Sequence, residues 1–261
     1  MRIGVVGIGF VGGAVAHWFE ARGQGDEVTR YDTHKGIGSP DVIRSAEVVF
    51  VCVPTPFHED GRGYDDSAVE ETLAFLVPSQ IVVIKSTIVP GSTVRYQKRF
   101  PRLSILFNPE FLVAKTAQDD FLHPERQIVG FTPESRPLAE RILGMLPTAS
   151  YAKIMPAMEA ELVKYFGNTF LATRVIFANQ FFDLCRALGA DYETVKAAAG
   201  ADSRIGASHF NVLEGGYRGY GGACLPKDVA ALLSFAESLK VQMSLLKEVQ
   251  RINRKLLNGE H

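Results

Sequence analysis

A cysteine, a lysine and an aspartate follow a run of glycines in the stretch GYGGACLPKD, which ends at Asp228. A thiolate is a strong nucleophile, and glycines beside it let a ligand approach the backbone closely. Lys227 and Asp228 are near enough in sequence to influence the ionisation of the Cys224 thiol. Cys224 is therefore a candidate nucleophile. The alternative is a cysteine without a chemical role, as we expect for Cys52 and Cys185, which lie within regular elements.

A second group of polar residues has spacings that suit catalysis. Lys164 and Asn168 are four residues apart in a helical pattern, so they lie on one face of a helix. Thr87 and Glu110 each follow an apolar run typical of a strand, and Thr55 follows a third. Ligands of open α/β sheets bind beyond the carboxyl ends of the strands. The alternatives are a solvated lysine, an ordinary helical asparagine and ordinary loop residues.

The sequence GIGFVG forms a G-x-G-x-x-G motif after the first apolar run and before a helical pattern. In this context Gly7 makes a tight turn, Gly9 lets the backbone approach a pyrophosphate, and Gly12 lets the helix pack on the strand. Asp32 ends the second strand, where a carboxylate accepts hydrogen bonds from ribose hydroxyls and repels a 2′-phosphate. This favours NAD over NADP, although Lys35 weakens the preference. The alternative is a glycine turn without a ligand.

These residues require a scaffold of strands and helices in alternation. We expect strands at 2–7, 27–32, 47–53, 81–86, 104–107, 127–131 and 149–154. Continuously apolar strands separated by helical patterns predict an α/β fold, a Rossmann-type doubly wound parallel sheet. A further helix is expected at 135–146.

The pattern changes near Pro156, after which we expect an all-helical domain. Residues 157–190 form one long helical pattern that ends at a candidate C-cap, Gly189. A stripe at spacings of three and four, which we expect to be buried and which could also form a subunit interface, consists of Leu162, Phe166, Phe170, Thr173, Phe177, Phe181, Leu184 and Leu188. From Pro226 onward the pattern is again helical. The predicted domains are therefore 1–155, which binds the dinucleotide, and 156–261, which is helical and carries the cysteine loop.

Composition excludes several classes of protein. A net charge of −1 gives no electrostatic footprint for nucleic acid or an acidic membrane surface. No apolar run is long enough to cross a bilayer. Three cysteines far apart in sequence, with no clustered histidines, predict neither a metal site nor a disulfide framework. We expect a cytoplasmic protein that acts on a small molecule.

Taken together, the chain resembles the UDP-glucose/GDP-mannose dehydrogenase family. The resemblance is carried, in family order, by GIGFVG, VPTP, KSTIVPG, NPEFL, PERQIVG, ELVKYFGNTFLA and GYGGACLPKD. It implies an NAD-dependent, four-electron oxidation of a sugar-nucleotide primary alcohol to a carboxylate through a thiohemiacetal and a thioester. It also implies a homodimer paired through the long helix.

The resemblance assigns roles to the residues above. Cys224 would be the nucleophile, Lys164 and Asn168 would stabilise oxyanions, Thr87 would position water, Glu110 would act as general base, and Asp228 would orient water or a proton acceptor. The expected cofactor-binding residues are Gly7, Gly9, Phe10, Val11, Gly12, Asp32, Lys35, Val53, Pro54, Thr55 and Thr87. The expected substrate-binding residues are Glu110, Phe111, Leu112, Lys164, Asn168, Arg218, Tyr220, Gly221 and Gly222.

Three departures from the family pattern leave the substrate open. The sequence stops where family members usually continue into a second nucleotide-binding domain, so we expect either a short homologue or a fragment. Ala114 stands where a glutamate is usual, and the stretch after Asp32 is short. The alternatives are a two-electron β-hydroxyacid-type dehydrogenase in which Cys224 is idle, and a non-catalytic NAD-binding dimeric module.

Overall fold

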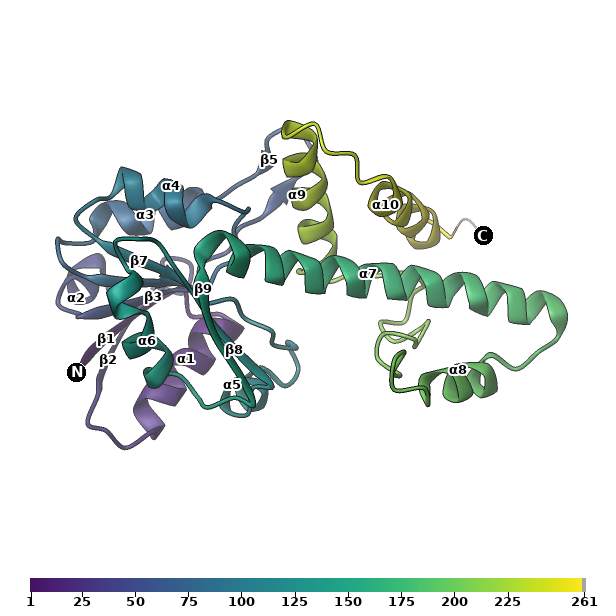
Figure 1. Cartoon of the computed structure of the whole chain (residues 1–261), viewed down its shortest axis with the longest axis horizontal. Helices are drawn as coiled ribbons and strands as arrows, with labels where there is room; N and C mark the ends of the chain where they lie inside the picture. Colours follow the sequence, from purple (N-terminus) through teal and green to yellow (C-terminus); the bar gives the residue numbers. More distant parts are fainter. Residues whose placement is uncertain (260–261) are drawn as a thin grey trace. The chain divides into compact units, whose positions relative to one another are not determined.

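The structure is a computed structural model that describes residues 1–259 (Figure 1). The chain divides into two compact units, Met1–Lys164 and Tyr165–His261, so the division falls within the long helix α7 (Ala157–Leu188). The assignment of functional domains with a boundary near residue 155 stays a prediction. The helical pattern predicted after Pro226 extended to residues 260–261, which lie outside the described residues.

A seven-stranded sheet forms the centre of the first unit, in the order β2-β1-β3-β6-β7-β8-β9. Its strands are β1 (Arg2–Val6), β2 (Glu27–Tyr31), β3 (Val48–Val51), β6 (Ile81–Ile84), β7 (Ser104–Phe107), β8 (Arg126–Phe131) and β9 (Tyr151–Pro156). The seven predicted strands are therefore present, with ends within two residues of those expected. Because β2 and β3 flank β1 on opposite sides, the carboxyl ends of β1 and β3 form the topological switch point at which ligands of such sheets bind.

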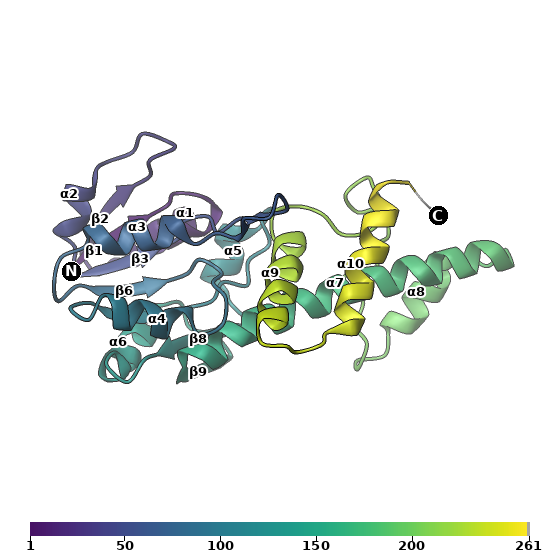
Figure 2. The ribbon, with the colours of Figure 1, turned by 90° about the horizontal axis from the view of Figure 1, so that it is seen from above.

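Both faces of the sheet are apolar and covered by helices. The helices of this unit are α1 (Phe10–Ala21), α2 (Pro40–Arg44), α3 (Ser67–Phe75), α4 (Ser92–Arg99), α5 (Ala117–Leu122), the 3₁₀ helix η1 (Arg136–Leu138) and α6 (Ala139–Met145). Val48 and Phe50 of β3 belong to a core shared with α1, α5 and α6. Val49 and Val51 belong to the opposite core, shared with α2, α3, α4 and the start of α7. Figures 1 and 2 show α3 and α4 on one face and α1 on the other.

The sheet is not wholly parallel as predicted, because β8 runs antiparallel to β7. The segment between these strands contains only the six-residue helix α5. It returns the chain to the sheet at the end where β7 stopped, since residues at the start of β8 line the same cavity as residues just after β7. Without a crossover along the sheet face, β8 must run in the opposite direction, and β9 then pairs with it in parallel.

A small hairpin that the sequence analysis missed follows β3. Strand β4 (Phe57–His58) pairs antiparallel with β5 (Gly63–Tyr64). Each strand has only two residues, which is too short to give a hydrophobic periodicity. The hairpin nevertheless brings Tyr64 to the loop that carries Thr87, where the two residues share a hydrogen bond.

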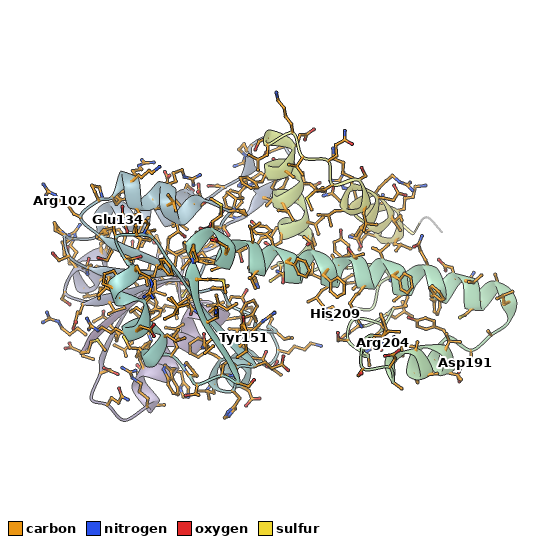
Figure 3. The ribbon with its side chains drawn as sticks, in the orientation of Figure 1. Arg102, Glu134, Tyr151, Asp191, Arg204 and His209 are labelled. Carbon is orange, nitrogen blue, oxygen red and sulfur yellow. The ribbon has the colours of Figure 1, made fainter. Side chains whose placement is uncertain are left out.

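The second unit is helical, as predicted. After α7 come α8 (Tyr192–Gly200), α9 (Leu225–Ser238) and α10 (Ser244–Leu257). Gly189 has a φ of +67°, which confirms the predicted glycine cap at the end of α7. Asp191, labelled in Figure 3, caps α8, because its carboxylate accepts hydrogen bonds from Glu193 N and Thr194 N.

The prediction that the apolar stripe of α7 is buried is wrong for the single chain. Its exposed members are Leu162, Phe166, Phe170, Phe177, Phe181, Leu184 and Leu188. Phe166 stacks on Phe170, and Phe177 packs on Phe181, so the rings contact one another along the helix. The periodicity identified a face correctly, but the rest of the described chain packs on other faces of α7.

Candidate active site

The glycine loop after β1 has the geometry that a dinucleotide phosphate requires. Gly7 has a φ of +84°, and a Cβ on it would lie 2.6 Å from Cys52 O. A Cβ on Gly12 would lie 1.9 Å from Gly7 O. Gly9 caps α1, and among the described residues no atom lies within 4 Å of where its Cβ would be. Gly7 and Gly12 are thus required by the fold, while Gly9 leaves open space before the helix N-terminus, where phosphates bind.

The first residues of α1 and the end of β2 border this loop. Phe10 is exposed and Val11 is half-buried in the first turn of α1. Asp32 follows β2, and its Oδ2 accepts a hydrogen bond from Ile8 N at 2.7 Å. Its Oδ1 accepts one from Lys35 N at 3.0 Å, and Lys35 Nζ donates to Ile8 O at 2.5 Å.

Asp32 is ionised at neutral pH. Burial raises the pKa of its carboxyl, but hydrogen bonds from the Ile8 and Lys35 amides and the charge of Lys35 outweigh burial, so the pKa lies below its usual value. A carboxylate in this position suits the acceptor role predicted toward ribose hydroxyls. Lys35 is bound to the glycine loop itself, which lessens its availability to a 2′-phosphate.

The segment after β3 supports the segment after β6. Val53 is half-buried and Pro54 is exposed, whereas Thr55 is buried. Thr55 Oγ1 donates a hydrogen bond to Thr87 O at 2.7 Å, and Tyr64 Oη donates to the same carbonyl at 3.2 Å. Thr87 is therefore held through its backbone by one predicted residue, Thr55, and by Tyr64, which was not anticipated from the sequence.

Lys164 and Glu110 form a buried ion pair within the first unit. Lys164 is only 4% exposed, so the alternative of a solvated lysine is wrong. Its Nζ donates to Glu110 O and to Glu110 Oε1, both at 2.7 Å, and Glu110 Oε2 accepts a hydrogen bond from Leu112 N at 2.8 Å. Burial raises the pKa of Glu110, but the charge and hydrogen bond of Lys164 outweigh burial and hold the pKa below its usual value.

A second buried lysine, Lys85, was missed by the sequence analysis. Its Nζ donates to Asn108 Oδ1 at 2.6 Å, and burial lowers its pKa to about 8, although the charge of Glu110 acts in the opposite direction. Asn108 Nδ2 in turn donates to Ile128 O at 2.7 Å. The available signal was a lysine at the end of the otherwise apolar run IVVIK, since a charge in that position requires partners.

A cavity of about 290 Å³ lies at this edge of the sheet. Its lining comprises Lys85, Pro109, Glu110, Phe111, Leu112, Val113, Asp120, Phe121, His123, Pro124, Glu125, Arg126 and Gln127. The Arg126 guanidinium lies 3.8 Å from the centre of the Phe111 ring, which orders one wall. Three predicted substrate-binding residues, Glu110, Phe111 and Leu112, therefore line one concave surface.

The second unit brings together Asn168, Asp228 and Lys227. Asn168 Nδ2 donates to Asp228 Oδ2 at 2.5 Å, and Lys227 Nζ donates to Asp228 Oδ1 at 2.5 Å. Asp228 is only 1% exposed, whereas Cys224 is exposed. Cys224 is the N-cap residue of α9, one turn before Asp228. The reactive residue type thus stands at a helix N-terminus, where the helix dipole favours an anion.

The glycine loop before Cys224 is fixed at its beginning and open at its tip. Arg218 makes a bidentate ion pair with Asp183 of α7 at 2.7 and 2.8 Å. Asn253 of α10 accepts a hydrogen bond from Tyr220 N at 2.6 Å and donates to Tyr220 O at 2.9 Å. Of the following residues, Gly221 is half-buried and Gly222 is exposed. Arg218 and Tyr220 hold the loop in the structure, and their role toward substrate stays a prediction.

The switch point, the glycine loop and the ionised Asp32 define a dinucleotide-binding domain of Rossmann topology. Residues 38–143 match the UDP-glucose/GDP-mannose dehydrogenase family, NAD binding domain, and residues 158–255 match the central domain of the same family. The chain belongs to the UDP-glucose/GDP-mannose dehydrogenase family. The open space at Gly9 and the carboxylate of Asp32 fit NAD, and the predicted cofactor is confirmed.

Individual relatives agree with this assignment. UDP-glucose 6-dehydrogenase of Rickettsia prowazekii is 34% identical over 221 residues, which are 81% of this chain and 50% of the relative. The enzyme of the same name from Pseudomonas aeruginosa is 37% identical over 227 residues, covering 81% and 49%. The solved UDP-glucose dehydrogenase of Pyrobaculum islandicum superposes with a TM-score of 0.84 at 30% identity, covering 97% of this chain and 68% of that one.

The chain spans about half the length of the curated relatives it matches. In the described part of the chain, no helix has both the length and the hydropathy needed to cross a membrane.

Proposed function

We propose that this chain oxidises the primary alcohol of a sugar nucleotide to the carboxylate, with Cys224 as the covalent nucleophile. The observation that carries the proposal is an exposed cysteine at the N-terminus of α9, one turn from a buried Asp228 that is bonded to Asn168. An ordered carboxylate–amide pair one turn along α9 from a thiol suits the proton transfers that covalent catalysis by the thiol needs. NAD, when bound, supplies the acceptor for the hydride that leaves in each of the two oxidations.

Each step at the protein balances in atoms and electrons. The alcohol loses a hydride and its hydroxyl proton to give an aldehyde. The thiolate of Cys224 adds to the aldehyde carbon, and the resulting alkoxide takes up a proton to give a thiohemiacetal. Loss of a second hydride and a proton gives a thioester. Water then attacks the thioester carbon, the C–S bond breaks, and the carboxylate and thiolate form with release of two protons. Lys164 and Asn168 would donate to the oxygen that carries negative charge in these steps.

The Lys164–Glu110 ion pair suggests how one residue pair serves two steps. While Lys164 is bound to Glu110, the carboxylate is a weak base, because its pKa is low and both oxygens accept hydrogen bonds. When Lys164 turns to a developing oxyanion, it leaves Glu110, whose basicity then rises. Glu110 could accept a proton from the attacking water at that stage, and Thr87 would position this water.

The decisive test counts NADH formed per molecule of UDP-glucose consumed, with carboxylate measured separately. Two NADH per substrate are expected from the thioester path. One NADH with an aldehyde or ketone product would support the two-electron alternative. NAD binding with no turnover over a panel of sugar nucleotides and smaller alcohols would contradict the proposal and favour a non-catalytic module.

We also propose that two copies of the chain pair through α7. Seven large apolar residues are exposed along one face of this helix, and two pairs of phenylalanine rings pack along it. Large contiguous apolar patches on soluble chains usually mark interfaces. A second copy is the natural occupant, because a long straight stripe pairs well with the same stripe in antiparallel orientation around a two-fold axis.

A charged substitution within the stripe tests this pairing. Phe177→Glu should raise the dimer dissociation constant at least about 100-fold, since it places a charge at the centre of an apolar interface. Ala198→Glu adds the same charge at an exposed position on α8 and should leave association unchanged. Analytical ultracentrifugation over a range of concentrations measures both. A wild-type chain that stays monomeric at high concentration would contradict the pairing.

A further inference from the structure

Glu161 is a fully buried acidic residue on the first turns of α7, within the first unit. Its Oε2 accepts a hydrogen bond from Gly91 N at 2.5 Å, and its Oε1 accepts from Thr93 N at 2.8 Å and from Thr93 Oγ1 at 2.5 Å. These donors lie at the start of α4, where Gly91 is the N-cap residue with a φ of +89°. Burial raises the pKa of Glu161, and the three hydrogen bonds oppose this change.

Glu161 lies three residues before Lys164, so the two side chains belong to adjoining positions on one side of α7. Glu161 fastens the helix to the segment that follows β6 and carries Thr87. Lys164 contacts the segment that follows β7 and carries Glu110. The first two turns of α7 therefore join two loops, each of which supplies a residue of the proposed reaction.

Helix geometry makes this junction sensitive. Moving α7 by one residue along its axis would shift Lys164 by about 1.5 Å and rotate it by about 100°. Errors of about 1 Å in the placement of a catalytic group can cost about 100-fold in rate. The three hydrogen bonds of Glu161 are directional, so they oppose such a movement of α7. The apolar contacts of Ala160 and Val163 have no preferred direction.

We propose that Glu161 is a positioning residue that sets Lys164 relative to Thr87 and Glu110. The inference rests on the proposed function for its kinetic consequence, but its structural consequence is independent of that function. The competing explanation is that Glu161 only caps α4, in which case its loss would weaken the fold without disturbing the Glu110 segment.

The test compares Glu161→Leu with Gln97→Leu in the full chain. Gln97 is a matched control, because it is buried on α4 and also makes three hydrogen bonds: with Leu103 O, Ile105 N and Thr132 Oγ1. Both variants should lose comparable stability to urea. Only Glu161→Leu should lower kcat, by about 10- to 100-fold, with less than about threefold change in KM or in the Kd for NAD. Glu161→Gln, which keeps the volume and one acceptor oxygen, should recover part of kcat.

Hydrogen–deuterium exchange supplies the readout that does not need turnover. Glu161→Leu should accelerate exchange at 86–93 and also at 108–112, including the Leu112 amide, which donates to Glu110, and Gln97→Leu should leave 108–112 protected. Faster exchange confined to 86–93 would overturn the positioning role and would mean that Glu161 only caps α4. If the wild-type chain forms no NADH, the proposed function fails, while the exchange comparison still decides for or against Glu161.

Discussion

Two glycine loops in this chain lead into helices, but they use the helix N-terminus differently. The loop at Gly7–Gly12 ends at α1, whose N-cap is Gly9, and no atom of residues 1–259 occupies the space where a side chain would be. The loop at 219–224 ends at α9, whose N-cap is Cys224, an exposed side chain of the protein itself. The first helix start is left open for an external anion. The second holds a side chain that can become one.

The surroundings of the glycines also differ between the two loops. In the first loop, Gly7 and Gly12 are enclosed by backbone atoms that cannot move away. In the second, Gly222 has a φ of +75°, but no atom of the described part of the chain lies within 4 Å of where its Cβ would be. The first loop is therefore fixed by steric exclusion. The second is fixed at its base by Arg218 and Tyr220. Side chains rather than backbone enclose two of its glycines, since a Cβ on Gly219 would lie 2.5 Å from Asn253 Oδ1 and one on Gly221 would lie 2.2 Å from Tyr217 Oη, and only Gly222 is open.

Removal of the Cys224 thiol at the start of α9 should have the largest effect on activity. Cys224→Ala is expected to lower carboxylate formation at least about 1,000-fold, because no thioester can form. NAD affinity should be unchanged, since the first loop is intact. Product analysis by mass spectrometry, with NADH counted in the same samples, measures this loss. A wild-type yield of carboxylate from the alanine variant would show that Cys224 is not the nucleophile, so the second loop would not have the catalytic role proposed for it.

Addition of one methyl group to the first loop should have the next largest effect. In Gly12→Ala the new Cβ would lie 1.9 Å from Gly7 O, so the loop must move. We expect the Kd for NAD to rise about 10- to 100-fold, or roughly 1.4–2.8 kcal/mol, and the free energy of unfolding to fall by about 1–3 kcal/mol.

The neighbouring glycine provides a matched control. Gly13 is also in the first turn of α1, and no atom that the structure describes lies within 4 Å of where its Cβ would be. Gly13→Ala should keep the Kd for NAD and raise stability by up to about 1 kcal/mol through helix propensity. Isothermal titration and urea unfolding of both variants separate a steric effect from a general effect of substitution. Equal losses in the two variants would refute the steric account.

The parts of the fold that depend on local pattern were predictable from the sequence. Apolar runs of four to six residues located the strands, and the ends of those runs located Thr87 and Glu110. The direction of β8 was not predictable, because it depends on which sheet edge the connection reaches. The stripe on α7 shows a similar limit: a period of 3.6 residues identifies an apolar face, but it does not say whether the same chain or another covers it.

The contacts among the candidate site residues also depended on tertiary structure. Spacing placed Lys164 and Asn168 on one helical face, but it did not predict that Lys164 binds Glu110 or that Asn168 binds Asp228. Lys85 and Glu161 were overlooked because their partners are distant in sequence, 23 and about 70 residues away. The lysine at the end of the apolar run IVVIK was the available signal for Lys85, whereas Glu161 lies outside the apolar stripe that the sequence led us to expect as the buried face.

The smallest expected effect concerns the cysteine beside the first loop. Cys52 packs against Gly7 and Gly12, and desolvation raises the pKa of its thiol to about 12. The Cys52 thiol is therefore protonated at pH 8, so its alkylation should be slow there. Iodoacetamide at pH 8 should therefore add one label to the folded chain, at Cys224, and the label should be absent from Cys224→Ala. Peptide mass spectrometry identifies the site, and unfolding in urea should expose all three cysteines to the reagent. Labelling of Cys52 at a rate similar to that of Cys224 would mean that the Gly7–Gly12 loop opens readily. The proposed difference between a closed first loop and an exposed Cys224 would then be wrong.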